Sequence, residues 1–152
     1  MPAAPAGSPA LLTPAGVFTT LHDSAGRLRG CIGFIEARRT LWETVWITAA
    51  DAATQDPRFD PVTAEEIPAL RLEISILSPL RKARPEEVKP GVHGVVLSRG
   101  LQRGLLLPQV ATEQGWDAET FLEACCDKAR LPRGSWRDSA KLEIFTAEVL
   151  TE

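Results

Sequence analysis

Alternating apolar and polar residues predict a β-hairpin near the start of the 152-residue chain. The segment GVFTTLH, residues 16–22, has the composition of a strand, and DSAG at residues 23–26 has that of a turn. RLRGCIGF, residues 27–34, alternates again, so we expect the two strands to pair. A third strand is predicted for LRLEISILSP, residues 70–79, and Pro79 marks its end.

Three more segments nearer the C-terminus have strand character. GVHGVVLSRG and GLLLPQV are joined by the Gly-bearing sequence SRGLQRG, which predicts a second strand pair. KLEIFTAEVL is expected to form one final strand. These three segments are residues 91–100, 104–110 and 141–150.

Two segments have the end signals of α-helices. In TLWETVWITAADAATQ, residues 40–55, Thr40 and Glu43 have the spacing of a capping box. The helix is expected to end at DPRFDP, residues 56–61, because its prolines lack a backbone donor. In DAETFLEACCDKAR, residues 117–130, an Asp cap precedes apolar residues at helical spacing, so a second helix is predicted there.

These elements predict an α+β fold. Strands and helices are mixed without the regular βαβ alternation of a parallel sheet, which favours a largely antiparallel β-sheet flanked by helices. A chain of 152 residues suits a single compact domain with a sizeable core. Residues 1–15 are rich in Ala and Pro and are expected to form a flexible arm, so the domain is assigned to residues 16–152.

Composition and charge narrow the classes of partner. The formal net charge of -3 and the pI of about 5.5 give no overall basic field, so only a local patch could bind nucleic acid. No apolar run approaches the ~20 residues needed to span a bilayer, and the N-terminal segment lacks the charged start of a signal peptide. We therefore expect no membrane-bound form. Three cysteines, two of them adjacent, indicate a reduced, cytoplasmic protein.

The first hairpin brings a thiol and two guanidinium groups to one strand. On strand geometry Arg27, Arg29 and Cys31 share one face, and the apolar positions between them face the core. Gly30 and Gly33 bracket the thiol and permit close approach of a ligand, close approach of another backbone segment, or a bulge. A nearby Arg favours the thiolate form of a cysteine. The alternative is a small buried cysteine that only packs.

A nucleophilic cysteine needs a base, and His93 is the better placed of the two histidines. It lies between two glycines in GVHGVV, which suits a turn at the mouth of a strand. Glu73 lies on the less apolar face of its strand, where it could orient His93 or simply face solvent. Arg58 could hold an anionic ligand, or it could pair with Asp56, with Asp60 or with carbonyl groups at a helix end.

Other familiar chemistries have no support in the sequence. The chain lacks the close Cys and His spacings of zinc sites, and Cys125 and Cys126 point about 100° apart on a helix. No Walker-type phosphate loop, dinucleotide-binding motif or serine-hydrolase elbow is present. No metal site is therefore predicted, while the cofactor and the oligomeric state stay unknown.

Five segments together resemble a known family: RLRGCIGF, AADAATQDPRF, LEISILSPL, GVHGVVL and LLLPQVATEQGW. In this order they resemble the AMME chromosomal region protein family, whose prokaryotic members are called AmmeMemoRadiSam system protein A. The resemblance covers residues 16–150, and the family signature RGCIG falls on Arg29, Gly30, Cys31, Ile32 and Gly33.

The resemblance implies an intracellular α+β domain with an antiparallel sheet flanked by helices. It also implies association with a Memo-like protein and a radical SAM protein, but no particular reaction. Relatives carry further helical sequence before the first strand, where this chain has only its Pro/Ala arm. The shape of any cleft near the signature therefore depends on what covers that part of the domain.

Two classes of function follow from these residues. As an enzyme, the protein would use Cys31 as nucleophile or covalent ligand, His93 as base, Glu73 as the group that orients the base, and Arg29 as anchor for a small anionic substrate. As a non-catalytic protein, it would use the same cleft to bind a nucleotide, an RNA end or a partner protein. In an adaptor for the Memo-like and radical SAM partners, Cys31 would be structural.

The tryptophans enter only the binding hypothesis. Trp42, Trp46 and Trp116 are candidate stacking surfaces for nucleotide bases, alongside the Arg27, Arg29 and Arg58 cations. The alternative for all three tryptophans is core packing, which is the usual role of large aromatic side chains.

Overall fold

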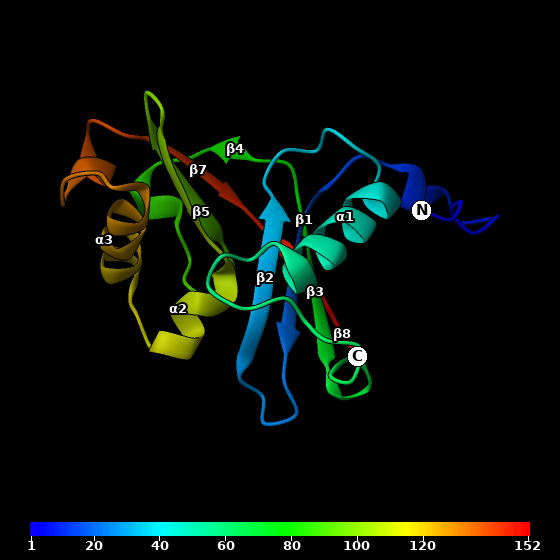
Figure 1. The fold of residues 1–152 in the computed structure, drawn as a ribbon. Helices are drawn as coiled ribbons and strands as arrows, with labels where there is room; N and C mark the ends of the chain where they lie inside the picture. The colour runs from blue at the N-terminus through cyan, green and yellow to red at the C-terminus, as the bar shows by residue number, and fades with distance from the viewer. The chain divides into compact units, whose positions relative to one another are not determined.

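The computed structural model describes residues 1–152 and confirms the α+β class (Figure 1). It contains two antiparallel four-stranded sheets and three α-helices. The chain divides into two compact units, and each is described by itself: unit 1 is Met1–Pro79 with Glu148–Glu152, and unit 2 is Leu80–Ala147. None of the helices combines the length and the apolar character needed to cross a membrane.

The sheet of unit 1 has the strand order β2-β1-β3-β8. The predicted hairpin is confirmed, because β1 pairs antiparallel with β2 on one side and with β3 on the other. β2 is therefore an edge strand of this sheet. The strands are β1 (Gly16–His22), β2 (Leu28–Phe34), β3 (Arg71–Leu77) and β8 (Ala147–Thr151).

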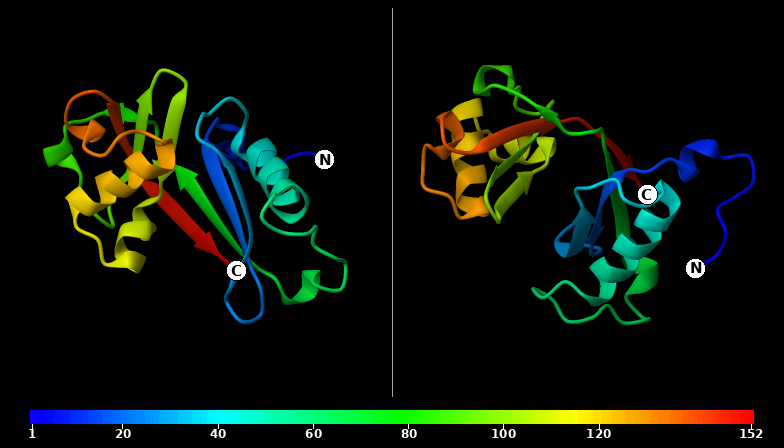
Figure 2. Two further views of the ribbon diagram at one scale, coloured as in Figure 1. Left: turned by 60° about the vertical axis from the view of Figure 1, so that its left-hand side comes forward. Right: turned by 90° about the horizontal axis from the view of Figure 1, so that it is seen from above.

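Helix α1 (Leu41–Thr54) packs across one face of β1 and β2, as Figures 1 and 2 show. The predicted capping box starts this helix: the Thr40 hydroxyl accepts from the Glu43 N–H, and the Glu43 carboxylate accepts from the Thr40 N–H. The buried hydroxyl groups of Thr19 and Thr48 lie 2.7 Å apart between β1 and α1. Thr19 thus identifies the face of β1 that α1 covers.

The N-terminal segment contains a short 3-10 helix, η1 (Pro9–Leu12). After it, the Thr13 carbonyl accepts from the Leu41 N–H at 2.8 Å, and the Trp42 indole donates to the Pro2 carbonyl at 2.9 Å. The flexibility of residues 1–15 and the assignment of the domain to residues 16–152 stay predictions.

Unit 2 is built around a second sheet with the order β4-β7-β5-β6. Helix α3 packs against β5 and β6, and its first turn begins at the predicted cap, where the Asp117 carboxylate accepts from the Thr120 N–H at 2.8 Å. Phe121, Leu122 and Cys125 of this helix are fully buried in the core. The elements are β4 (Arg81–Lys82), β5 (Gly94–Arg99), β6 (Gln102–Leu106), β7 (Lys141–Phe145), α2 (Pro108–Gln114) and α3 (Ala118–Ala129).

The structure corrects two predicted strands. The segment GLLLPQV is not all strand: β6 ends at Leu106, and Pro108 is the first residue of α2, where a missing N–H costs nothing. The segment KLEIFTAEVL forms two strands rather than one, because β7 and β8 are separated at Thr146 and belong to different sheets. Three further 3-10 helices complete the chain: η2 (Ile67–Ala69), η3 (Pro85–Glu87) and η4 (Ser135–Arg137).

Candidate functional site

Cys31 lies in a row of polar side chains across unit 1. Cys31 of β2 faces Thr20 of β1, and Thr20 faces Glu73 of β3. Because Thr19 points toward α1, its neighbour Thr20 points to the opposite face, and Cys31 and Glu73 share that face. The Cys31 thiol is half-buried, and its Sγ lies 3.3 Å from Thr20 Oγ1. The structure therefore places two of the predicted catalytic residues, Cys31 and Glu73, on either side of one hydroxyl.

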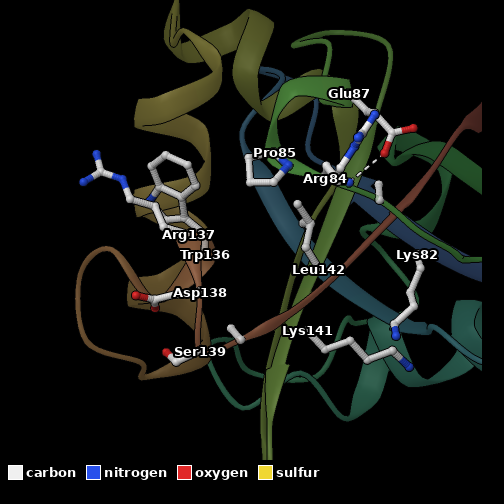
Figure 3. Close-up of a pocket in the computed structure, with 12 residues that line it drawn as sticks. Lys82, Arg84, Pro85, Glu87, Trp136, Arg137, Asp138, Ser139, Lys141 and Leu142 are labelled. Atoms are coloured by element: carbon white, nitrogen blue, oxygen red, sulfur yellow. Dashed lines mark hydrogen bonds between the residues drawn. The ribbon is translucent and has the colours of Figure 1, made fainter.

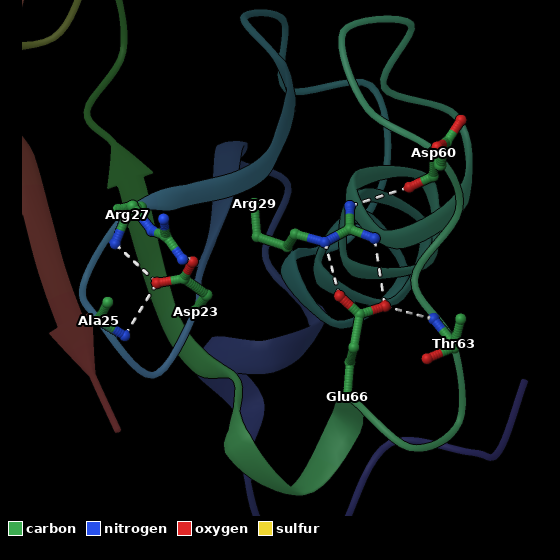
Figure 4. Close-up of polar contacts among 7 residues, drawn as sticks. All are labelled: Asp23, Ala25, Arg27, Arg29, Asp60, Thr63 and Glu66. Carbon is green, nitrogen blue, oxygen red and sulfur yellow. Dashed lines mark hydrogen bonds and ion pairs between the residues drawn. The ribbon is translucent and has the colours of Figure 1, made fainter.

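Arg29 does not follow the alternation that the sequence suggested. Leu21 pairs with Gly30 and His22 pairs with Leu28, so Arg29 is the extra residue of a β-bulge in β2. A bulge turns a side chain away from the direction that a regular strand would give it. Arg27 lies before β2 and pairs with Asp23 of the hairpin turn (Figure 4).

The redirected Arg29 guanidinium is held within unit 1 by the segment between α1 and β3 (Figure 4). Its Nε and Nη2 donate to the Glu66 carboxylate at 2.9 and 3.2 Å, and its Nη1 donates to the Asp60 carbonyl at 2.9 Å. Glu66 also accepts from the Thr63 N–H at 2.8 Å. Arg29, followed by Thr63, lowers the pKa of Glu66 to about 2. Arg29 thus ties a loop to β2, and its role as a ligand anchor stays a prediction.

Asp56 connects the thiol strand to a second arginine. This buried carboxylate accepts from the Cys31 N–H at 2.9 Å, at the outer edge of β2. It also accepts from Arg58 Nε at 3.0 Å, from Arg58 Nη2 at 2.7 Å and from the Arg58 N–H at 3.1 Å. Arg58, and after it the Cys31 N–H, hold the pKa of Asp56 well below its usual range. Of the two alternatives for Arg58, the structure shows pairing with Asp56.

The Arg58 side chain remains 56% exposed although it is paired. Pairing with Asp56 raises the pKa of Arg58, and a negative charge on Cys31 raises it further. Of the two predicted ligand-binding arginines, Arg58 is the one that shares a hydrogen-bond acceptor with Cys31, because Asp56 accepts from the Cys31 N–H and from the Arg58 guanidinium.

Close packing explains both glycines around Cys31. A Cβ atom on Gly30 would lie 2.1 Å from the Ala52 carbonyl oxygen of α1. A Cβ atom on Gly33 would lie 2.3 Å from the Phe18 ring. Gly30 thus allows α1 to lie on the sheet, and Gly33 makes room for an aromatic ring. Their contribution to ligand binding stays a prediction.

His93 belongs to unit 2, in the turn before β5. Its Nδ1 accepts from the Lys89 N–H at 3.1 Å, so the neutral imidazole carries its proton on Nε2. Burial lowers the pKa of His93, and the charges of Arg81 and Lys89 lower it further. In this state Nε2 is a hydrogen-bond donor, and Nδ1 is already engaged. The role of His93 as general base stays a prediction.

The remaining candidates divide between core and surface. Cys125 and Cys126 are fully buried, and burial raises the pKa of Cys125 to about 12. Trp116 packs against the core of unit 2. Trp42 and Trp46 form an edge-to-face pair with centroids 6.1 Å apart, and Trp46 is 42% exposed. Packing thus accounts for Trp116, while Trp46 presents part of its ring at the surface.

Sequence reasoning missed Thr20 and treated Asp56 only as a partner for Arg58. The sequence would identify Thr20 as the neighbour of Cys31 only if the register of the hairpin were known. The bulge at Arg29 shifts that register by one residue. Asp56 reaches the Cys31 N–H across 25 positions of sequence, which no local pattern reveals. No three His, Cys, Asp or Glu side chains form a group that could hold a metal ion.

Comparison with known proteins agrees with the fold. The sequence matches the AMMECR1 family over residues 1–150. A protein of Pyrobaculum islandicum is 45% identical over 148 residues, which cover 90% of this chain and 66% of that protein. Protein NEQ441 of Nanoarchaeum equitans is 42% identical over 141 residues, covering 88% of this chain and 78% of its own length.

A solved structure is also similar over nearly the whole chain. The crystal structure of the uncharacterized protein PH0010 from Pyrococcus horikoshii aligns with a TM-score of 0.89 and 41% sequence identity. The alignment covers 99% of this chain and 80% of that protein. Both the sequence match and the structural match include β2, α1 and the loop that carries Asp56 and Arg58. The chain therefore belongs to the AMMECR1 family.

Proposed function

We propose that this protein binds a small anionic ligand next to Cys31 and that the thiol is its reactive group. The observation that carries the proposal is the half-exposed Cys31 with a hydroxyl group 3.3 Å away and an arginine attached, through Asp56, to its own backbone N–H. A thiolate is the nucleophilic form of cysteine, and nearby positive charge favours it.

Arg58 would supply the charge that attracts the ligand. Its Nε and Nη2 are turned toward Asp56, while more than half of the side chain stays in contact with solvent. Because Asp56 is buried and accepts from two backbone N–H groups as well, it fixes the guanidinium beside β2. An anion that binds there would pair with a cation whose position is already ordered.

Thr20 would support the thiol. Its hydroxyl can donate to a Cys31 thiolate at the observed distance of 3.3 Å, and Glu73 lies on the other side of Thr20 in the same row. We assign Thr20 and Glu73 as positioning residues of this site. His93 is retained as a proposed base. To accept a proton at Nε2, its neutral imidazole would first have to carry its own proton on Nδ1, which would end the hydrogen bond from the Lys89 N–H.

In the catalytic form of the proposal, the Cys31 thiolate adds to an electrophilic carbon of the ligand. An S–C bond forms. In an addition the π electron pair of the carbon moves to its multiply bonded partner atom, and in a substitution the bond to a leaving group breaks and that group departs with the electron pair. The thiol proton goes to water or to a base. In the non-catalytic form, the same ligand binds beside Arg58 without forming this bond.

The location and partners of the protein are part of the proposal. We place it in the cytoplasm, which is consistent with three cysteines that form no disulfide. As a protein of the AmmeMemoRadiSam system protein A type, it would act together with Memo-like and radical SAM proteins. This assignment of partners rests on the sequence resemblance alone.

The test compares alkylation of Cys31 by two reagents, neutral iodoacetamide and negatively charged iodoacetate, with peptide mapping to identify the modified cysteine. Cys125 and Cys126 serve as internal controls, because both are buried and should react only after unfolding. We expect Cys31 to react in the folded protein, and the ratio of iodoacetate to iodoacetamide rates to fall several-fold in Arg58→Gln.

Two further variants keep the result interpretable. Arg58→Lys retains the charge and should retain most of the rate ratio. Arg27→Gln removes an exposed arginine that pairs only within the hairpin turn, so it should leave the ratio unchanged. If Cys31 resists both reagents until the protein unfolds, the thiol function is wrong. If Cys31 reacts but the ratio is the same in every variant, the anion-binding role of Arg58 is wrong.

A further inference from the structure

Unit 2 carries an open groove that is separate from the elements of the thiol site. It lies between residues 82–87, at the end of β4 and in η3, and residues 136–142, from η4 to the start of β7 (Figure 3). Its volume is about 1000 Å³, which is enough for an extended ligand. Pro85, Trp136 and Leu142 give it an apolar surface. We refer to it as the basic groove.

Positive charge dominates the walls of the basic groove. Lys82, Arg84, Arg137 and Lys141 line it, against only two carboxylates, one of which is Glu87. The Glu87 carboxylate is already committed, because it accepts from the guanidinium of a neighbouring arginine at 3.2 Å and from the Arg84 N–H at 2.6 Å. Glu87 therefore does little to neutralise the lysines of the groove.

Two of the four cations form ion pairs with glutamates. Arg137 pairs with a glutamate outside the groove at 2.9 Å, and Lys141 lies 3.5 Å from Glu143. The Lys82 ammonium and the Arg84 guanidinium take part in neither of these pairs, although Lys82 is opposite Glu143 in the β4–β7 ladder and the Arg84 N–H and charge help to lower the pKa of Glu87. These two side chains are exposed and available to an anionic ligand.

The pairing of β4 with β7 sets the neighbours of Lys82. Lys82 is opposite Glu143 in the β4–β7 ladder, and the Ala83 N–H donates to the Leu142 carbonyl at 3.2 Å. Arg84 lies two residues beyond Lys82, after the ladder ends, and it lines the groove together with Lys141, the first residue of β7. A bound anion would therefore meet several positive charges.

The lining favours a peptide over a nucleic acid as occupant. Asp138 lies on the wall of the groove, where its carboxylate would repel a continuous phosphate backbone but could accept from peptide N–H groups. The net charge of -3 also gives the chain no general attraction for polyanions. A peptide with a few carboxylates beside apolar side chains matches both the cations and the apolar surface of Pro85 and Leu142.

We infer that the basic groove binds an extended acidic segment of a partner protein. Carboxylates of the segment pair with Lys82, Arg84 and Lys141, and an apolar side chain lies against Pro85 and Leu142. This interaction surface is independent of the thiol chemistry, because none of its residues belongs to unit 1. Loss of Cys31 reactivity would therefore leave it unaffected.

The test uses fluorescence anisotropy with the full chain and two labelled hexapeptides. One alternates Glu with Leu, and the other has Gln in place of every Glu. We expect saturable binding of the Glu peptide that weakens as salt is added, and no comparable binding of the Gln peptide. Lys82→Gln combined with Lys141→Gln should lower the affinity by about tenfold, because each exposed ion pair contributes roughly threefold.

Lys128→Gln is the matched control, since Lys128 is in the last turn of α3 and does not line the groove. It removes one positive charge, as each of the two groove changes does, and should leave the affinity unchanged. Equal binding of both peptides, no saturable binding, or an equal loss in the control would overturn the inference. Tighter binding of an oligouridylate that depends on Lys82 and Lys141 would also overturn it, in favour of nucleic acid.

Discussion

The change of Asp56 to Asn tests whether this buried carboxylate holds the thiol strand and Arg58 together. Asp56 accepts four hydrogen bonds, three from Arg58 and one from the Cys31 N–H. Asn keeps one acceptor oxygen and replaces the other by an NH₂ group. This NH₂ group would face N–H donors, and it cannot accept hydrogen bonds from them. At least two of the four contacts are therefore lost, together with the charge.

The expected cost is about 2–3 kcal/mol in the free energy of unfolding at pH 7. A hydrogen bond to a charged group contributes roughly 1.5–3 kcal/mol, so the loss of two such bonds would cost about 3–6 kcal/mol if both were fully shielded from solvent. Solvent screening reduces this figure, because the Arg58 side chain is 56% exposed. The measurement is denaturant unfolding followed by tryptophan fluorescence, compared between the natural protein and Asp56→Asn.

The pH dependence of the effect follows from the direction of the pKa shift. The pKa of Asp56 is lower in the folded protein than its unfolded value of about 3.9. The carboxylate therefore stabilises the fold fully above about pH 5, and this contribution is lost as the pH falls toward the folded pKa. We expect the difference between the natural protein and Asp56→Asn to be constant from pH 7 to about pH 5 and to shrink below it.

Asp23→Asn provides the matched control. Asp23 also accepts from two backbone N–H groups and from the Nε of an arginine, Arg27, but that arginine is 79% exposed in a hairpin turn. Its loss should cost clearly less than the loss of Asp56. The reasoning is refuted if the two variants are equally destabilised, or if the effect of Asp56→Asn does not diminish in acid.

Two further predictions concern the packing of α1 on the sheet and are checked by the same unfolding measurement. Gly30→Ala should destabilise the protein by about 2–3 kcal/mol, because the new methyl group meets the Ala52 backbone carbonyl. Gly33→Ala should cost less, because its methyl group meets the Phe18 ring, which can move. Thr48→Val should cost about 1–2 kcal/mol by leaving the Thr19 hydroxyl buried without a partner, and adding Thr19→Val should recover most of that loss. Equal effects of the two glycine changes, or no recovery in the double variant, would contradict these packing arguments.

Features that depend on neighbouring residues could be predicted from the sequence. The capping box of Thr40 and Glu43 and the cap at Asp117 are local, and both helices begin where these signals indicate. The hairpin of β1 and β2 was also recognisable, because apolar and polar residues alternate in both strands and the segment between them, DSAG, is made of residues typical of turns. The α+β class follows from these elements alone.

Features that depend on distant residues could not be predicted in the same way. The direction of Arg29 is set by a bulge and by Glu66, which is 37 positions away, so regular alternation gave the wrong direction for that side chain. The break at Thr146 is likewise invisible locally, because β7 and β8 differ in the sheets that they join and not in their composition. Pro108 did carry a local signal for a helix start, which the apolar run before it obscured.

The edge position of β2 explains why the thiol and Arg58 occur together. An edge strand has N–H groups that no neighbouring strand satisfies, and at Cys31 the acceptor is the Asp56 carboxylate. A buried carboxylate needs a cation or several donors, and Arg58 provides both. The Cys31 N–H at the sheet edge needs an acceptor, which is the Asp56 carboxylate. The buried carboxylate in turn needs a cation, which is the Arg58 guanidinium. The same contacts that complete the edge of the sheet also fix Arg58 through the carboxylate that binds the Cys31 N–H. If Arg58 acts on the thiol as proposed, a change at Asp56 should alter both stability and Cys31 alkylation, whereas a change at Thr48 should alter stability alone.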